Sequence, residues 1–202
     1  MAGHLIVMSV DAMVFEDLEI LKHCKNTARL LKNGALIERM HTIYPSLTHP
    51  VHVTCMTGCY PDKTGVYSNE HFVLGELNPP WYNSLSDVKT ETIFHAAKKA
   101  GLTTAACRWP VTANGDDVID YLVPEIMDAD LDGDLQSVYA RLGSGRIIED
   151  IVKPNLSMLD GNKRPQYDAF EIKCAADIIK KYKPNLLFTH PGLVDHTRHE
   201  TG

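Results

Sequence analysis

The sequence predicts an α/β fold in which a mostly parallel sheet carries helices on both faces. Short apolar runs alternate with longer stretches of helical periodicity along the chain, which is the pattern of such folds. The runs rich in β-branched residues show little polar alternation, as expected for strands buried on both faces. A length of 202 residues without a repeat or a linker fits one domain over residues 1–202.

The first half of the chain alternates predicted strands and helices. In order, these are a strand at His4–Val10 ended by Asp11, a helix at Asp17–Lys32 stopped by Asn33-Gly34, a strand at Ala35–His41, a turn at Tyr44-Pro45, a short helix from Thr48, a helix at Thr90–Ala100 and a strand at Leu102–Arg108. The helix at Thr90–Ala100 ends at Gly101, which suits a helix terminus.

The second half continues the alternation. Predicted here are a strand at Asp117–Val123, helices at Asp134–Leu142 and Gly145–Val152, an amphipathic helix at Tyr167–Lys181 and a strand at Asn185–Thr189 leading into His190–Gly202. The acidic stretch Asp128–Asp134 resembles a calcium loop, but Tyr139 stands where that loop needs an acidic residue. We therefore predict a solvated acidic turn there.

Composition excludes some partners. The net charge is −6, from 20 basic and 26 acidic residues, and no basic run could hold a duplex backbone, so duplex nucleic acid is disfavoured. Free nucleotides stay possible because metal ions can supply positive charge locally. The apolar run Leu5–Val10 is too short for a signal peptide or a membrane span, and five scattered cysteines suit a reducing compartment. We expect a cytoplasmic protein without a membrane contact.

Candidate chemistry lies where predicted strands end. Asp11 follows the first strand, and Asp195 follows the last, so both should lie beyond the carboxyl edge of one sheet. Thr48 stands at a predicted helix start, where backbone N–H groups favour an anion and a hydroxyl can act as a nucleophile. Asp195 and His199 are four residues apart and could share one metal ion, with His196 as the competing imidazole.

Four ordered segments carry a resemblance to a known family. They are V-M-S-V-D at the start, Y-P-S-L-T-H-P-V-H-V-T-C-M-T-G-C-Y-P-D-K-T-G-V-Y-S-N, the blocks W-Y-N-S and G-L-T-T-A-A-C-R-W-P, and V-D-H-T-R-H-E-T-G at the end. Over nearly its whole length the chain resembles the amino-terminal part of a type I phosphodiesterase/nucleotide pyrophosphatase of the alkaline phosphatase superfamily. An alkaline phosphatase-like core is therefore implied.

The resemblance implies a role for each candidate. Asp11 is implied as a ligand of one of two zinc ions, and Thr48 as the nucleophile bound to that zinc. Asn69 is implied as the donor to a non-bridging phosphate oxygen. Asp195 and His199 are implied as ligands of the second zinc, which favours His199 over His196. The activity implied is metal-dependent hydrolysis of a small phosphodiester or of a nucleotide pyrophosphate bond, through a phospho-threonine.

The chain also departs from the family pattern. Val51 replaces a common asparagine, and Arg198 replaces a common glycine before the ligand histidine. The pattern continues past Gly202 with an Asp-His pair and a later histidine, so each zinc would have two protein ligands here, where stable sites have three or four. We therefore expect a domain that lacks its carboxyl-terminal part, with little activity and with an exposed sheet edge that allows self-association.

Two other functions stay open. A phosphomonoesterase or another hydrolase of the superfamily could use the same half-site, although a sulfatase would need an arginine that the segment after Thr48 lacks. A non-catalytic, metal-poor fragment is the second alternative. An unrelated nucleotide-binding domain is disfavoured because no glycine-rich phosphate loop is present.

Overall fold

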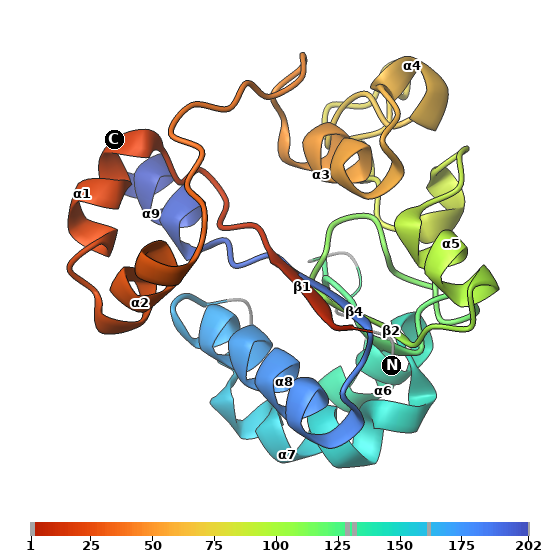
Figure 1. Cartoon of the computed structure of the whole chain (residues 1–202). Helices are drawn as coiled ribbons and strands as arrows, with labels where there is room; N and C mark the ends of the chain where they lie inside the picture. The colour runs from red at the N-terminus through yellow and green to blue at the C-terminus, as the bar shows by residue number, and fades with distance from the viewer. Residues whose placement is uncertain (1–2, 128–129, 131–132, 161–162, 202) are drawn as a thin grey trace.

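A parallel sheet runs through the middle of the molecule and separates two groups of helices (Figure 1). The computed structural model describes residues 3–127, 130, 133–160 and 163–201. Its strands are β1 (Leu5–Met8), β2 (Thr104–Cys107), β3 (Tyr121–Val123) and β4 (Leu186–Thr189), in the order β1-β4-β2-β3. Each neighbouring pair is parallel, which confirms the predicted α/β class.

The helices connect these strands. The α-helices are α1 (Leu18–Leu21), α2 (Lys25–Asn33), α3 (Thr48–Thr57), α4 (Pro61–Thr64), α5 (Ile93–Lys99), α6 (Leu135–Leu142), α7 (Lys153–Asn155), α8 (Gln166–Tyr182) and α9 (Leu193–Thr201). Short 3₁₀ turns are η1 (Phe15–Asp17), η2 (Leu85–Asp87), η4 (Gly145–Ile147) and η6 (Leu156–Met158), and η5 (Ile148–Val152) is a π-helix. No helix in the described part of the chain is long and apolar enough to cross a membrane.

The central strands bury both of their faces because successive side chains point to opposite sides. In β2, Ala105 and Cys107 contact the core formed with α6, η5 and α8, whereas Ala106 contacts the core formed with α3 and α5. In β4, Leu187 faces the first core and Phe188 the second. The helices therefore cover both faces, as predicted.

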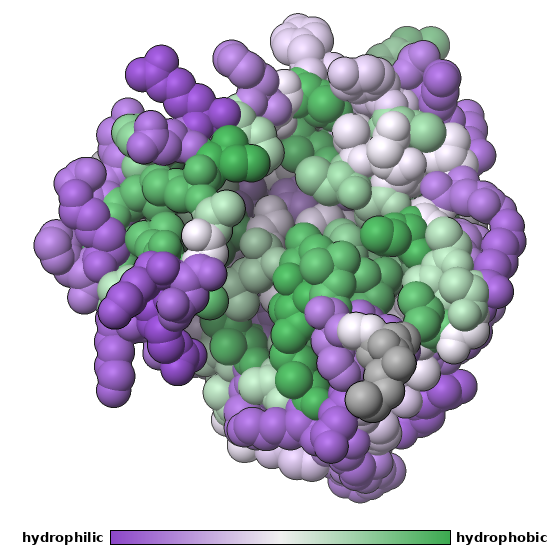
Figure 2. All heavy atoms as spheres, in the orientation of Figure 1, coloured by the Kyte–Doolittle hydropathy of each residue, from purple (hydrophilic) through white to green (hydrophobic). Residues whose placement is uncertain are grey.

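Strand β1 is an edge strand with a poorly covered surface. Leu5 and Ile6 are each 51% exposed and Met8 is 56% exposed. Figure 2 shows apolar side chains gathered on the face of the molecule where β1 lies. The expected exposed apolar edge is therefore present.

Two predicted elements are wrong. The segment Ala35–His41 forms no strand: Leu36, Ile37 and Met40 are 50%, 76% and 86% exposed. Its apolar composition suits a strand, but a strand also needs a neighbour to pair with, and no bridge joins this segment to the rest of the described chain. The predicted helix Asp17–Lys32 is broken at residues 22–24, where no apolar side chain anchors the turn.

Most other elements agree with prediction within a few residues. The strand predicted at Asp117–Val123 shortens to β3, and the helix predicted at Gly145–Val152 becomes a 3₁₀ turn followed by a π-helix. Asp134 caps α6 by accepting a hydrogen bond from the Ser137 N–H at 3.1 Å, as suits a turn before a helix. Most of the acidic stretch Asp128–Asp134 lies outside the described residues.

Candidate active site beyond the carboxyl edge of the sheet

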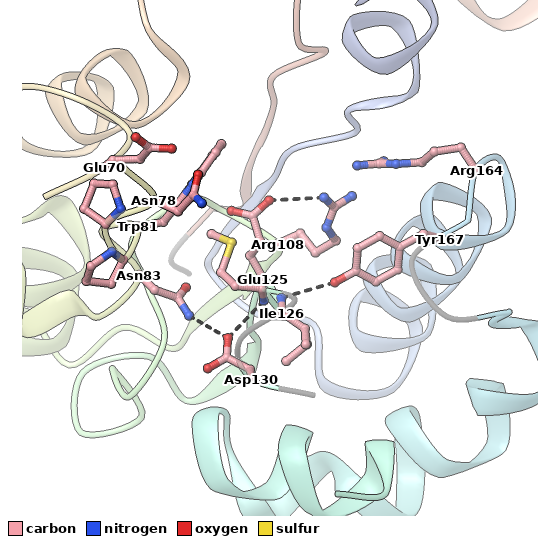
Figure 3. Close-up of a pocket in the computed structure, with 13 residues that line it drawn as sticks. Glu70, Asn78, Trp81, Asn83, Arg108, Glu125, Ile126, Asp130, Arg164 and Tyr167 are labelled. Atoms are coloured by element: carbon pink, nitrogen blue, oxygen red, sulfur yellow. Dashed lines mark hydrogen bonds and ion pairs between the residues drawn. The ribbon is translucent and has the colours of Figure 1, made fainter. Parts of the chain in front are cut away.

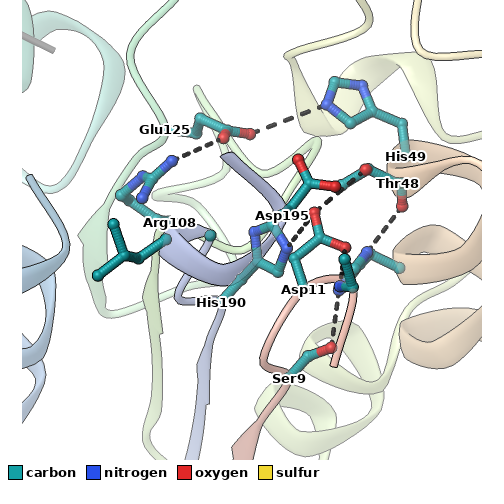
Figure 4. Close-up of polar contacts among 12 residues, drawn as sticks. Ser9, Asp11, Thr48, His49, Arg108, Glu125, His190 and Asp195 are labelled. Carbon is teal, nitrogen blue, oxygen red and sulfur yellow. Dashed lines mark hydrogen bonds and ion pairs between the residues drawn. The ribbon is translucent and has the colours of Figure 1, made fainter. Parts of the chain in front are cut away.

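Thr48 is the first residue of α3, a helix of ten residues that begins after the extended residue Leu47 and ends at Gly58, where φ is +67°. Residues at the start of a helix leave backbone N–H groups unpaired and oriented toward an incoming anion. The Thr48 hydroxyl donates a hydrogen bond to Asp11 Oδ2 at 3.2 Å (Figure 4). The structure thus brings together two side chains that are 37 positions apart in the sequence.

Asp11 is positioned by an extension of the sheet beyond β1. The Ser9 N–H donates to the Thr189 carbonyl at 3.0 Å, and the Asp11 N–H donates to the Pro191 carbonyl at 3.0 Å. Asp11 Oδ1 accepts a hydrogen bond from the Ala12 N–H at 3.0 Å, which leaves Oδ2 toward Thr48. Asp11 is therefore fixed by backbone that pairs with β4 and the residues after it.

Two buried imidazoles complete this part of the site, and the sequence interpretation missed both. His190 Nε2 lies 3.2 Å from Asp11 Oδ2, and the His190 ring lies 4.2 Å from the His52 ring, centroid to centroid. His52 Nδ1 lies 2.7 Å from the Thr48 carbonyl, so this nitrogen carries the proton and donates. His52 Nε2 then accepts from the Ser9 hydroxyl at 2.9 Å.

The electrostatics favour an ionised Asp11 carboxylate near a neutral His52 ring. Burial raises the pKa of Asp11, but the neighbouring His190 and Thr48 hold it below its ordinary value. Burial lowers the pKa of His52 to about 4, so His52 is neutral near pH 7. Two signals in the sequence could have found these rings: His52 is four residues after Thr48 on one helix, and His190 directly follows β4.

Asn69 lies beside the start of α3. Its Oδ1 accepts a hydrogen bond from the His49 backbone N–H at 2.9 Å. Because a backbone N–H can only donate, this contact fixes which end of the amide is oxygen. The Nδ2 group is therefore left to donate, as the implied role of Asn69 requires.

Asp195 and His199 lie one turn apart on α9, with His199 Nε2 3.5 Å from Asp195 Oδ1. In Figure 4 the carboxylate of Asp195 points toward Thr48 and Asp11. The His199 side chain is 80% exposed, and within the described chain it contacts Asp195 rather than Thr48. His196 instead approaches Glu200, with 3.3 Å between Nε2 and Oε1, so His199 is the imidazole that pairs with Asp195.

Arg198 does not oppose a cation at Asp195. Its guanidinium points away from that carboxylate and donates from Nη2 to Asp17 Oδ1 at 2.8 Å and Oδ2 at 3.1 Å, and from Nη1 to the Ala12 carbonyl. This arginine therefore ties α9 to the loop after β1. The arginine that replaces the family's common glycine here thus forms contacts that a glycine could not make.

The donor atoms suit zinc in kind but not in number. Carboxylate oxygen and imidazole nitrogen are ordinary zinc ligands. Asp195 and His199 supply one of each, whereas Asp11 supplies a carboxylate beside the Thr48 hydroxyl. Among the described residues, no group of three or more His, Cys, Asp or Glu side chains could hold a metal ion. The described residues thus provide two separate pairs of donor atoms.

Comparison with known families gives this geometry a context. The pattern of the family described as type I phosphodiesterase / nucleotide pyrophosphatase matches residues 5–202. The chain belongs to this family. Members of the family are phosphodiesterase and pyrophosphatase hydrolases, and the match covers Asp11, Thr48 and Asp195 together. The resemblance inferred from the four sequence segments is therefore confirmed.

Relatives agree with this membership. The human ectonucleotide pyrophosphatase/phosphodiesterase family member 1 is 31% identical over 111 residues, which is 49% of this chain and 11% of that protein. The rat family member 3 is 30% identical over 126 residues, covering 55% of this chain and 14% of that protein. This chain thus matches only a small part of these relatives.

Solved structures share the fold at low sequence identity. Murine ectonucleotide pyrophosphatase/phosphodiesterase 5, in an inactive form in complex with AMP, has a TM-score of 0.59 at 17% identity, over 98% of this chain and 45% of that chain. Phosphonoacetate hydrolase from Sinorhizobium meliloti in complex with phosphonoformate has a TM-score of 0.63 at 17% identity, over 96% and 48%. The chain thus spans about half the length of these structures.

Proposed function

We propose that this chain supplies the nucleophile and half of the metal ligands of a phosphodiesterase or nucleotide pyrophosphatase. The observation that carries the proposal is the 3.2 Å hydrogen bond from the Thr48 hydroxyl to Asp11, at the first residue of α3. Family membership and the AMP in the complex of the murine relative support a small phosphodiester or nucleotide as substrate.

In the proposed reaction, separate residues bind the phosphate, attack the phosphorus and accept the proton. At the start of α3 the His49 N–H already donates to Asn69 Oδ1, the Val51 N–H donates to the Leu47 carbonyl, and Pro50 has no N–H. The Thr48 N–H is therefore the backbone donor for the phosphate, and Asn69 Nδ2 donates to a non-bridging oxygen. Asp11 Oδ2 accepts the Thr48 proton as the Thr48 Oγ–phosphorus bond forms and the phosphorus–oxygen bond to the leaving alcohol or phosphate breaks. The phospho-threonine is then hydrolysed by water, which restores the Thr48 hydroxyl.

Two zinc ions, if bound, would lower the pKa of the attacking hydroxyl and neutralise charge on the phosphate. Asp11 and Thr48 would hold one ion, and Asp195 and His199 the other. We propose that the further ligands come from residues outside this chain, and that the chain is the amino-terminal part of one alkaline phosphatase-like domain. Hydrolysis by the chain alone should then be weak.

The test compares three forms of the protein on p-nitrophenyl thymidine monophosphate, with zinc added. We expect Thr48→Ala to lose at least about 10³-fold in kcat and Thr48→Ser to retain part of it, because a nucleophile is essential to a covalent mechanism. Wild-type hydrolysis by Thr48→Ala would contradict the proposal. The same measurement belongs on the longest natural protein that contains residues 1–202, where the rate should be higher.

Two alternatives have their own tests. A preference for p-nitrophenyl phosphate over its diesters would indicate a phosphomonoesterase, which could use the same Thr48 and Asp11 pair. A non-catalytic, metal-poor fragment would contain no zinc after purification in its presence. Near-stoichiometric zinc would contradict that alternative.

We further propose that the chain self-associates along β1, because this edge strand exposes apolar side chains and unpaired backbone groups. A cytoplasmic location also stays a prediction, supported by five cysteines that are all free. Neither duplex nucleic acid nor a membrane is proposed as a partner.

A further inference from the structure

Residues 189–193 connect β4 to α9, and we call them the β4–α9 turn. The carbonyl group of Pro191 in this turn accepts a hydrogen bond from the Asp11 N–H at 3.0 Å. The His190 ring of the same turn lies 3.2 Å from Asp11, measured from Nε2 to Oδ2 (Figure 4). The position of Asp11 therefore depends on the position of this turn.

Two carboxylates of α8 bind the donor groups of the β4–α9 turn. Glu171 Oε1 accepts hydrogen bonds from the Thr189 hydroxyl at 2.7 Å and from the His190 N–H at 2.8 Å. Asp168, three residues earlier on the helix, binds the N–H groups of the last two residues of the turn. Glu171 is thus the carboxylate beside the part of the turn that contacts Asp11.

Glu171 is itself fixed by a buried arginine. Its side chain is 0% exposed, and its Oε2 accepts a hydrogen bond from Arg108 Nη1 at 3.2 Å. Arg108 also donates from Nη2 to Glu125 Oε1 at 3.2 Å, and its guanidinium lies 4.1 Å from the centroid of the Tyr167 ring (Figure 3). The φ of Arg108 is +51°, in a region that residues other than glycine keep only where their surroundings fix them. Glu171 therefore joins the residue after β2 to the β4–α9 turn.

The contacts of Glu171 use both of its carboxylate oxygens. One oxygen binds the turn and the other binds Arg108, so a glutamine, with one acceptor oxygen, could bind only one of them. Burial raises the pKa of Glu171, whereas the charge of Arg108 and the hydrogen bond from Thr189 oppose this effect. A buried ion pair adds little net stability over apolar residues of similar size. The arrangement thus fits a role in holding the turn in place better than a role in stability alone.

We propose that Glu171, fixed by Arg108, is a positioning residue for Asp11. The inference rests on the proposed function, in which Asp11 accepts the Thr48 proton. Glu171 acts through the turn, because it binds His190, whose ring contacts Asp11 and whose next residue accepts from the Asp11 N–H. Loss of the carboxylate should let the turn move, so that Asp11 lies less often at the distance that proton transfer requires.

The first test is amide hydrogen exchange followed by NMR, which needs neither metal nor substrate. The reference is the Leu102 N–H, which donates to the Ala97 carbonyl at 2.9 Å and precedes β2. In Glu171→Gln, the Asp11 N–H should exchange at least about tenfold faster relative to this reference, as expected when a hydrogen bond to a charged acceptor is lost. Glu171→Leu, which lacks both oxygens, should show a larger ratio, and Glu171→Gln decides the test if Glu171→Leu does not fold.

Asp120→Asn is the matched control for this measurement. Asp120 is also buried, at 7% exposed, but it accepts a hydrogen bond from the Thr104 N–H at 2.9 Å, at the start of β2 and away from the β4–α9 turn. Its substitution should not raise the exchange of the Asp11 N–H relative to the Leu102 N–H by more than about twofold. If Glu171 contributed only to stability, Glu171→Gln would speed both amides equally, and that result would overturn the proposal.

The second test measures kcat and KM separately for p-nitrophenyl thymidine monophosphate. Glu171→Gln should lower kcat about tenfold and leave KM within about twofold, because the phosphate-binding groups, the Thr48 N–H and Asn69, stay in place. Asp120→Asn should keep both constants. An unchanged kcat in Glu171→Gln, with or without faster exchange at Asp11, would overturn the proposal.

The two measurements keep this proposal distinct from the proposed function. If the wild-type protein hydrolyses no phosphodiester and Glu171→Gln still speeds exchange at Asp11, the proposed function fails and the positioning of Asp11 by Glu171 stands. If Thr48→Ala abolishes hydrolysis but Glu171→Gln changes neither the exchange ratio nor kcat, the proposed function stands and the role of Glu171 is overturned.

Discussion

Asp168 joins three parts of the structure, and its removal should destabilise the protein strongly. This residue of α8 is 4% exposed. Its Oδ1 accepts hydrogen bonds from the Gly192 N–H at 2.7 Å and the Leu193 N–H at 2.9 Å, and its Oδ2 pairs with Arg164. Since Leu193 is the first residue of α9, Asp168 caps the helix that carries Asp195.

The contacts set the expected magnitude. A hydrogen bond to a charged acceptor contributes about 1.5–3 kcal/mol, and removing one partner of a buried ion pair costs about 3–5 kcal/mol. One carboxylate makes all three contacts, so these values overlap and do not add. We expect Asp168→Ala to lower the free energy of unfolding by about 3–5 kcal/mol. Asp168→Asn keeps an acceptor for the two N–H groups and should cost about 2 kcal/mol.

Urea unfolding followed by far-UV circular dichroism measures both variants, with an unchanged m-value as the check on two-state behaviour. Asp160→Asn is the control, because Asp160 and Lys163 form an ion pair whose side chains are 62% and 70% exposed. It should change the free energy of unfolding by less than about 0.5 kcal/mol. If Asp168→Ala stays within about 1 kcal/mol of the wild type, the capping argument is refuted.

Three further predictions concern the site, acid stability and the edge strand. Asn69→Ala should lower kcat for a diester by about 10²-fold, and an unchanged kcat would contradict its role as donor. Burial raises the pKa of Asp120, but Lys98 and the Thr104 N–H hold it below its ordinary value. Asp120 therefore stabilises the protein above about pH 4, and this stabilisation is lost as the pH falls through its folded-state pKa. The free energy of unfolding of Asp120→Asn should depend less on pH below about pH 4 than that of the wild type, and the same pH dependence in both proteins would contradict this prediction. Ile6→Lys on β1, where Ile6 is 51% exposed, should weaken self-association in sedimentation velocity at least about tenfold, and unchanged sedimentation would exclude β1 as the interface.

The sequence predicts those elements that a local pattern determines. In β4 and in the long helix α8, the apolar residues that predict the element are also the residues that pack in the core. Phe170 and Cys174 of α8, for example, are fully buried. The strand predicted at Ala35–His41 is wrong because a strand needs a pairing partner from a distant part of the chain, and local composition does not indicate whether one exists. The boundary of each element also depends on packing, as in the break after α1.

Some residues of the candidate site were likewise predicted from the sequence, and others were not. Asp11, Thr48, Asn69, Asp195 and His199 were named from the sequence, and the structure places Asp11 against Thr48 and Asp195 against His199. The buried rings of His52 and His190 were missed because their sequence signals, a position four residues after Thr48 and a position directly after β4, point to one site only when the strands are assembled.

The position of β4 between β1 and β2 has a consequence for how the protein folds during synthesis. Leu5 pairs with Leu186, so the first strand of the chain joins the rest of the sheet only through a strand made more than 180 residues later. Contacts this distant close slowly because the chain must lose the entropy of a long loop first. A nascent chain that has not yet released β4 from the ribosome therefore holds Asp11 on an unpaired apolar strand, and this is the stage at which a chaperone would matter most.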